Sequence, residues 1–295
     1  MRLEEPEILE NLMPSTVPYD VVCRQNKLLA ISRKRDSLGR AVALLRIDEE
    51  LFDCPKDEKF LLKFLRARKY EAEAAFRSIK NYFRARRDNP DIFDDFVPSA
   101  IPYDAVCRKN RLVTASTQRD ALGRGVVLIK TGAWDGSICS VYEFISCCFM
   151  VVEWLLLHED VQKRGVVYIL DYQGLGLHHL TQFTPLLIRR LVHISEDCLP
   201  VRVKAVYVVN GPSVFDVIFA ITKPFMKAKL VERVHLIGSN VDKLLNVVPS
   251  DVIPKEFEGT HESYDYDQLE RDLLSRSEYF EELCRYGYGK ESTHC

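Results

Sequence analysis

The stretch RGVVYILDY, residues 164–172, is an almost unbroken apolar run rich in β-branched residues. Such a run is typical of a strand that is buried on both faces of a sheet. A second run, VKAVYVVN at residues 203–210, has the same character, and a helix-length segment separates the two. Strands that alternate with helices of this length predict a largely parallel sheet covered by helices. The sequence therefore indicates an α/β fold.

The segments around these strands complete the predicted domain organisation. RDALGRGVVLIK, residues 119–130, predicts a turn from Asp120 to Gly123 followed by the strand GVVLIK. Apolar periodicity predicts helices at about 140–158 and 181–195 and a last amphipathic helix within 263–290. Residues 47–98 read as a helical N-terminal lobe with apolar stripes and cationic helix ends. Residues 99–262 then form the α/β lobe.

Composition limits the class of protein. The chain has 295 residues, 47% of them hydrophobic and 28% charged, with a formal net charge of −2. This balance lacks the basic footprint of a nucleic-acid-binding protein. Nine cysteines without a CxxC spacing, behind an acidic start, predict reduced thiols in a soluble cytoplasmic protein. The longest apolar run, 144–157, is short for a membrane span and contains Glu153.

Motifs that would indicate catalysis are incomplete. DYQGLGLHH, residues 171–179, follows a strand, but His179 stands where a dinucleotide fingerprint needs its third glycine. Ser213 lacks the GxSxG context of a hydrolase, and the seven histidines include no HExxH pair. We therefore expect no catalytic residues, no cofactor and no metal, which favours a binding protein over an oxidoreductase.

Two helices are unusually apolar. Residues 140–158 carry apolar side chains over most of the helix, which indicates a central core helix or the wall of a ligand pocket. Residues 212–222 leave almost no polar face, and a basic run from Lys223 to Arg233 follows. This second pattern fits either a buried helix before a solvated one or a helix at an anionic membrane surface.

Several extended motifs occur in the order found in the CRAL-TRIO lipid-transfer family, which the chain resembles. They are FLLKFLRARKY at 60–70, AFRSIKNYFRARRDNPDIF at 75–93, RDALGRGVVLI at 119–129, YILDYQGL at 168–175, the long run 209–238 and IPKEFEGT at 253–260. The resemblance covers about residues 49–286 and is strongest to the tocopherol carriers of the family. Glu258 departs from it, because glycine is usual at that position.

The resemblance implies a carrier whose α/β lobe encloses a lipid in an apolar pocket, closed by a mobile gate helix at about 213–225. The expected ligand is a tocopherol, a retinoid or a related isoprenoid. Cys148 and Val152 stand where the tocopherol carriers have serines, which leaves fewer hydroxyl groups to bind a chromanol head. Carried over position by position, the pocket would be lined by Ile145, Cys148, Val152, Val166, Ile194, Leu199, Val201, Val206, Phe215, Ile218 and Phe219.

The resemblance also implies an anion site for a phosphoinositide headgroup. Its positions are all basic in this chain: Arg68, Arg202, Lys204, Lys229 and Arg233. Guanidinium and ammonium groups suit phosphate recognition. The predicted function is transfer of a hydrophobic lipid to membranes by a cytoplasmic carrier that contacts them peripherally, with release assisted by phosphatidylinositol bisphosphate. The alternative is a lipid-sensing or scaffold module that presents its ligand to a partner.

The chain contains an internal repeat. Residues 5–46 nearly repeat residues 89–130 at a constant offset of 84 positions. Only the second copy is followed by the predicted pocket and gate, and a lone hairpin is marginal in water. We therefore expect one lipid site in a monomer. The first copy, 1–46, is expected to pack weakly, to add at a sheet edge or to exchange with a second molecule as a swapped dimer; a wrongly joined gene would also produce it.

Overall fold

The computed structural model describes residues 29–35, 41–45, 54–239, 241–255, 259–260 and 265–288. Its main sheet has the strand order β3-β4-β5-β6-β7. β3 pairs antiparallel with β4, and every other neighbouring pair is parallel. The predicted α/β fold with a mostly parallel sheet is therefore confirmed. The strands are β3 Val113–Ala115, β4 Gly125–Lys130, β5 Val166–Asp171, β6 Val203–Val209 and β7 Val234–Gly238.

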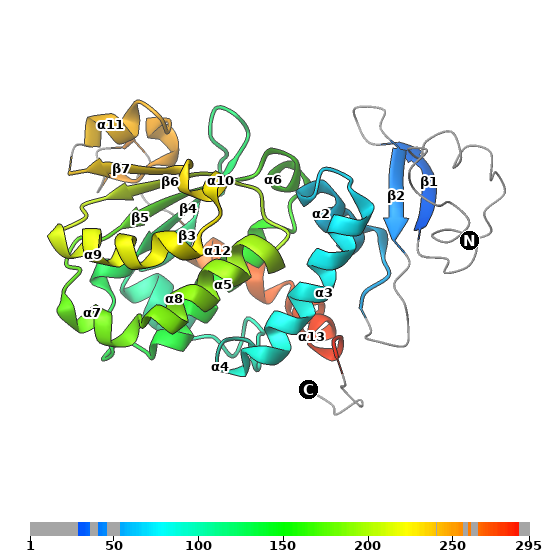
Figure 1. Cartoon of the computed structure of the whole chain (residues 1–295), viewed down its shortest axis with the longest axis horizontal. Helices are drawn as coiled ribbons and strands as arrows, with labels where there is room; N and C mark the ends of the chain where they lie inside the picture. The colour runs from blue at the N-terminus through cyan, green and yellow to red at the C-terminus, as the bar shows by residue number, and fades with distance from the viewer. Residues whose placement is uncertain are drawn as a thin grey trace.

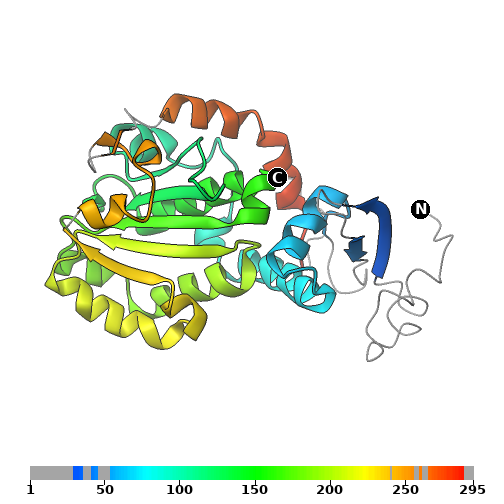
Figure 2. The same ribbon diagram turned by 90° about the horizontal axis from the view of Figure 1, so that it is seen from above.

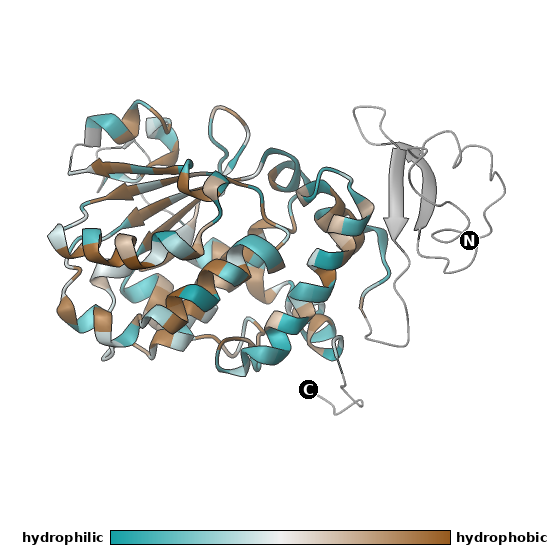
Figure 3. Ribbon diagram, in the orientation of Figure 1, coloured by the Kyte–Doolittle hydropathy of each residue, from teal (hydrophilic) through white to brown (hydrophobic). Residues whose placement is uncertain are grey.

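Helices cover both faces of this sheet. α5 (Val141–Leu155), α8 (Pro185–His193) and α9 (Ser213–Thr222) pack on one face, and α11 (Val241–Leu245) packs on the other (Figures 1 and 2). Figure 3 shows apolar residues along the strands and on α9. Shorter elements connect these layers: η2 Asp104–Lys109, η3 Thr131–Ala133, α6 Glu159–Arg164, α7 Leu177–Gln182, η4 Ile194–Cys198, η5 Lys223–Phe225, α10 Ala228–Val231 and η6 Ser250–Val252.

The helical lobe consists of α2 (Glu58–Ala67), α3 (Ala72–Asp88) and α4 (Pro90–Phe93). Asp57 caps α2 by accepting the N–H of Phe60 at 2.9 Å. α5 has a reciprocal cap, because the Ser140 hydroxyl accepts the Glu143 N–H while the Glu143 carboxylate accepts the Ser140 N–H. These local devices explain why the predicted helices begin where they do.

Two predicted helices are broken in the structure. The segment predicted as one helix at 181–195 belongs to α7 and α8, which are separated at Phe183, and the helical path then continues through η4. The break occurs because the Thr184 hydroxyl caps α8 and Pro185 begins it. The predicted last helix is also two helices, α12 (Tyr266–Leu274) and α13 (Ser277–Arg285).

The repeat is visible in the backbone. β1 (Leu29–Arg35) and β2 (Ala41–Leu45) form a separate antiparallel hairpin with Leu29 opposite Leu45. Adding 84 to both numbers gives Val113 opposite Ile129, which is the register of β3 and β4. The hairpin contacts α2 (Figure 1) and is not added to the edge of the main sheet, so that expectation is wrong. The rest of residues 1–46 lies outside the described residues.

Deleting residues 1–46 is expected to leave ligand binding intact, because the second hairpin alone supplies the strands that join β5. The measurement is the set of lipids that copurifies with the truncated and the full chain, by mass spectrometry. A thermal unfolding curve of the truncated chain is the control for folding. Loss of the lipid from a truncated chain that still unfolds cooperatively would contradict the prediction.

Candidate functional site

The two faces of the central strand β5 differ in exposure. Val167 and Ile169 point to the α11 face and are buried, with 0% and 1% of their surface exposed. Tyr168 and Leu170 alternate with them, so they point to the face of α5, α8 and α9, yet both are only half-buried. Side chains of a central strand beneath a layer of helices thus retain accessible surface on this face alone.

The predicted pocket residues surround this face, in two adjoining apolar clusters. Seven of them belong to or pack against the cluster centred on α5 and the start of β5: Ile145, Cys148, Val152, Val166, Ile194, Leu199 and Val201. Four belong to or pack against the cluster between β6 and α9: Val206, Phe215, Ile218 and Phe219. The structure therefore brings the predicted set to one side of the sheet, and their contact with a lipid stays a prediction.

Two polar groups lie among these apolar side chains. Burial raises the pKa of the Cys148 thiol well above its usual range, and burial likewise raises the pKa of the Tyr168 phenol. Both groups are therefore neutral and protonated at physiological pH, so each has a hydrogen to donate to an oxygen of a ligand. Tyr168 was not predicted as a site residue, although its position two residues after Val166 on the same strand face was the available signal.

Helix α9, the predicted gate, has one buried residue, and its other apolar residues that pack on the sheet side stay partly exposed. Phe215 is buried, and its ring lies 4.9 Å from the ring of Tyr172 and 5.8 Å from that of Phe219, centroid to centroid. Within α9, only Phe215 is fully buried, while Val217 is 51% exposed. A helix this apolar with a single buried anchor has an outer face that water does not favour.

Basic residues gather at the edge of the sheet where the parallel strands begin. Arg124 precedes β4, Arg202 precedes β6, and Arg233 precedes β7. Burial lowers the pKa of the Lys204 ammonium, and nearby cations lower it further: Arg202, Arg233, Arg124 and Lys229. Three other predicted anion-site residues, Arg202, Lys229 and Arg233, are thus close enough to Lys204 to repel its ammonium. Arg124 also lies at this edge and was not among the predicted residues. Its guanidinium pairs with Asp120 at 2.5 Å.

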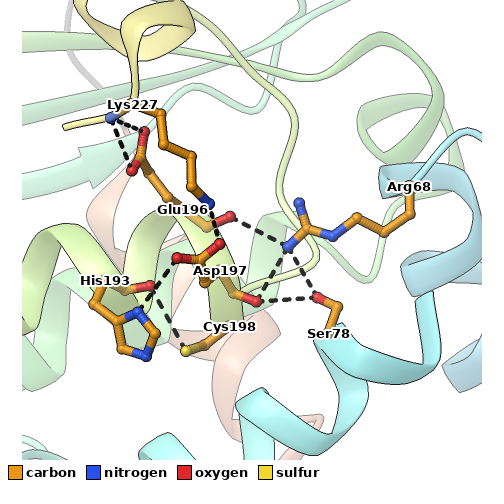
Figure 4. A network of polar contacts seen from close by, with 7 residues as sticks. All are labelled: Arg68, Ser78, His193, Glu196, Asp197, Cys198 and Lys227. Carbon is orange, nitrogen blue, oxygen red and sulfur yellow. Dashed lines mark hydrogen bonds and ion pairs between the residues drawn. The ribbon is translucent and has the colours of Figure 1, made fainter. Parts of the chain in front are cut away.

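Arg68, the fifth predicted residue, has other partners. Its guanidinium donates to the Ser78 hydroxyl at 2.9 Å and to the backbone carbonyls of Glu196 and Asp197, each at 3.2 Å (Figure 4). Burial lowers the pKa of Arg68. Its contacts join the end of α2 to η4, so Arg68 holds the helical lobe against η4.

His179, which interrupts the glycine motif, has structural contacts. The ring of His179 is buried, accepts the Gly176 N–H at Nδ1 and lies 3.0 Å from the Trp134 carbonyl through Nε2. Burial lowers the pKa of His179, which keeps the imidazole neutral. Ser213 is exposed at the start of α9. In the described part of the chain, no three His, Cys, Asp or Glu side chains are placed to hold a metal, and no helix is long and apolar enough to cross a bilayer.

Comparison with known proteins gives two matching family profiles. The profile of the CRAL/TRIO domain matches residues 109–259, and that of the CRAL/TRIO N-terminal domain matches residues 15–81. The second match begins inside the first repeat copy, earlier than the predicted start of the helical lobe at residue 47. The deletion of residues 1–46 is therefore also a test of whether that part of the N-terminal domain is needed.

Curated relatives and a solved structure match over most of the chain. Alpha-tocopherol transfer protein-like from Homo sapiens is 35% identical over 230 residues, which are 78% of this chain and 66% of the relative. Clavesin-1 from Xenopus laevis is 30% identical over 74% of this chain and 65% of its own length. The chain thus spans about two thirds of the length of these relatives. The crystal structure of Sfh5 matches with a TM-score of 0.51 at 15% identity, covering 76% of this chain and 80% of that one.

Proposed function

Because the chain belongs to the CRAL/TRIO domain family, whose members bind and transfer lipophilic ligands, we propose that it is a non-enzymatic carrier of a bulky hydrophobic lipid. The observation that carries the proposal is the half-buried state of Tyr168 and Leu170 on the central strand, beneath the helices of the α9 face. An apolar ligand lying against these side chains would cover the accessible surface that the protein itself leaves. The proposed class of ligand is a tocopherol, a retinoid or a related isoprenoid.

Energetics make a membrane the favoured acceptor for such a ligand. Exposing apolar groups to water costs about 0.8 kcal/mol per CH₂, so ten such groups hold the ligand by roughly 8 kcal/mol. Release into a bilayer removes this cost. Large apolar side chains are exposed on and beside the gate, as this role requires: Leu177 at 75%, Leu186 at 68%, Val217 at 51% and Phe225 at 37%.

We propose that a phosphoinositide assists release at the basic edge of the sheet. Arg202, Lys204 and Arg233 lie close together there, and Lys229 extends the same set from α10. Repulsion between these cations is relieved when a multiply charged phosphate headgroup binds, which favours such a ligand over a neutral one. Since α10 follows the gate within a few residues, an anion bound at this edge is placed to influence α9.

Mass spectrometry of the lipids that copurify with the full chain is the direct test. The expected result is one predominant hydrophobic ligand in a defined molar ratio to protein. The recovered lipid, labelled with deuterium, is then moved from donor to acceptor vesicles, and its transfer is expected to accelerate when the protein is added. Absence of a copurifying lipid would contradict the carrier, whereas binding without transfer would indicate a lipid-sensing module.

A further inference from the structure

Lys227 joins the end of the gate to the body of the protein in two ways. Its backbone N–H donates to both carboxylate oxygens of Glu196, at 3.2 and 3.3 Å, and its ammonium pairs with the carboxylate of Asp197. Glu196 and Asp197 both belong to η4, while Lys227 lies two residues after η5, between the gate and α10 (Figure 4). One residue therefore ties the gate to η4 by its backbone and by its side chain.

The backbone of the two residues that carry these carboxylates is held by the helical lobe. Arg68 donates to the backbone carbonyls of both, and the Ser78 hydroxyl donates to that of Asp197 at 3.4 Å. Asp197 also lies 3.3 Å from the His193 ring through its second oxygen. Burial by itself would raise the pKa of Asp197, but the ammonium of Lys227 lowers it overall, so the carboxylate is charged at neutral pH. The contact is thus a charged pair on a rigid base.

A pocket of about 470 Å³ opens at this contact, between α8, η4 and η5. Its lining combines apolar side chains with charged ones: Leu186, Arg189, Arg190, His193, Glu196, Asp197, Phe225 and Lys227. Leu186 and Phe225 are among the exposed apolar residues of the gate side. Arg189 is exposed and has no hydrogen-bond or ion-pair partner among the described residues. The pocket therefore offers a cation to an incoming anion on the side where apolar side chains meet the solvent.

We propose that Glu196 and Asp197 form a carboxylate latch on the gate, and that a phosphate group entering this pocket opens the latch by taking Lys227 together with Arg189. The two carboxylates occupy on Lys227 the positions that phosphate oxygens would take. A phosphate with two negative charges can replace both carboxylates on Lys227, and Arg189 gives it a second cation that the carboxylates do not pair with. This inference rests on the proposed gating role of α9 and adds the contact that keeps α9 closed.

Hydrogen exchange of residues 213–226 in the full chain is the test. The double variant Glu196→Gln, Asp197→Asn keeps the shape of both side chains and removes their charge. Exchange of the gate amides is expected to rise about threefold to fivefold, the factor given by loss of one partly exposed ion pair. Lys227→Met is expected to give a similar rise. Lys59→Met, which removes an exposed cation on α2 outside the gate, is the control and should leave exchange of the gate amides unchanged.

Soluble anions distinguish the source of the phosphate. Inorganic phosphate, inositol trisphosphate and a short-chain, water-soluble phosphatidylinositol bisphosphate are added separately to the unaltered chain. Each anion is also added to Lys229→Ala, which alters the basic edge and leaves the latch residues intact. If the rise in gate exchange persists in that variant, a rise with inorganic phosphate or inositol trisphosphate supports a free anion as the opener, and a rise with the lipid alone supports a membrane-borne one. A rise that Lys229→Ala abolishes assigns the opening to the basic edge and overturns phosphate binding at the latch. The latch would be overturned if no anion raised the exchange of the gate amides. It would also be overturned if both variants left that exchange unchanged while keeping the unfolding midpoint. Copurification of a lipid is independent of these rates, so the carrier and the latch can fail separately.

Discussion

Replacing Lys63 by methionine is expected to lower the free energy of unfolding by about 3–5 kcal/mol, the cost of leaving one member of a buried ion pair without its partner. Lys63 lies on α2 and Glu153 on α5, with the ammonium nitrogen 3.2 Å from the carboxylate. Their side chains are only 2% and 1% exposed. Without the ammonium, a carboxylate remains in the core, and one of its oxygens already has no partner among the described residues.

The surroundings of Lys63 explain why the pair is worth this much. The Tyr279 hydroxyl on α13 lies 3.0 Å from the ammonium nitrogen. Four aromatic rings surround the same nitrogen at 4.8 to 5.8 Å from their centroids, namely those of Phe60, Phe64, Tyr82 and Tyr279. A desolvated ammonium over an aromatic ring gains about 2 kcal/mol. The site thus fastens the helical lobe and the C-terminal helix to the central helix.

Chemical denaturation of matched variants separates the ion pair from general packing. Arg77→Met removes the cation of an exposed pair with Glu73, whose side chains are 70% and 81% exposed, and should cost less than about 1 kcal/mol. The double variant Lys63→Met, Glu153→Met replaces both charges by apolar groups and should recover most of the loss. If Lys63→Met costs no more than Arg77→Met, the buried pair does not hold the lobes together.

The free energy of unfolding of Lys63→Met is expected to depend less on alkaline pH than that of the unaltered chain. Burial alone would lower the pKa of Lys63, but Glu153 and the neighbouring tyrosines outweigh it and raise the pKa above its ordinary value. The stabilisation is therefore complete below the unfolded-state pKa of about 10.4 and decreases as the pH rises further. Unfolding free energies measured across that range should fall more steeply for the unaltered chain than for Lys63→Met.

Strands β4, β5 and β6 and the central helix α5 were predictable because their signals are local. The apolar run that predicts β5 lies within the strand itself. The cap of α5, from Ser140 to Glu143, lies within four consecutive residues. The break before α8 was also local, since Thr184 and Pro185 form a start signal, but the apolar period across it favoured one helix. Here a cap outweighed periodicity.

Side chains that meet only through strand register were not predictable. Arg124 joins the basic edge because β4 runs parallel to β5. Tyr168 differs, because its place two residues after Val166 on the same strand was a signal in the sequence. Lys227 and Asp197 are 30 positions apart, and no spacing in the sequence connects them. The family resemblance supplied the predicted pocket and anion-site positions, whereas the partners of Arg68 required the folded chain.

Replacing Lys229 and Arg233 by alanine is expected to reduce the stimulation of lipid transfer by phosphatidylinositol bisphosphate at least tenfold. Each charge-assisted hydrogen bond to a phosphate contributes about 1.5–3 kcal/mol, and two are removed. The measurement is the ratio of vesicle-to-vesicle transfer rates of the copurifying lipid with and without the phosphoinositide in the acceptor vesicles. For the double variant this ratio should approach one.

The two positions carry different structural roles, so the single variants make the test decisive. Arg233 also donates to the Val203 carbonyl, and its truncation can therefore weaken the start of β6 and β7. Lys229 is exposed on α10, and Lys229→Ala alone should lower the ratio without changing the unfolding midpoint. Lys59→Ala, which removes an exposed cation on α2, controls for net charge. A ratio that Lys229→Ala and the double variant leave unchanged would place the phosphoinositide away from the basic edge.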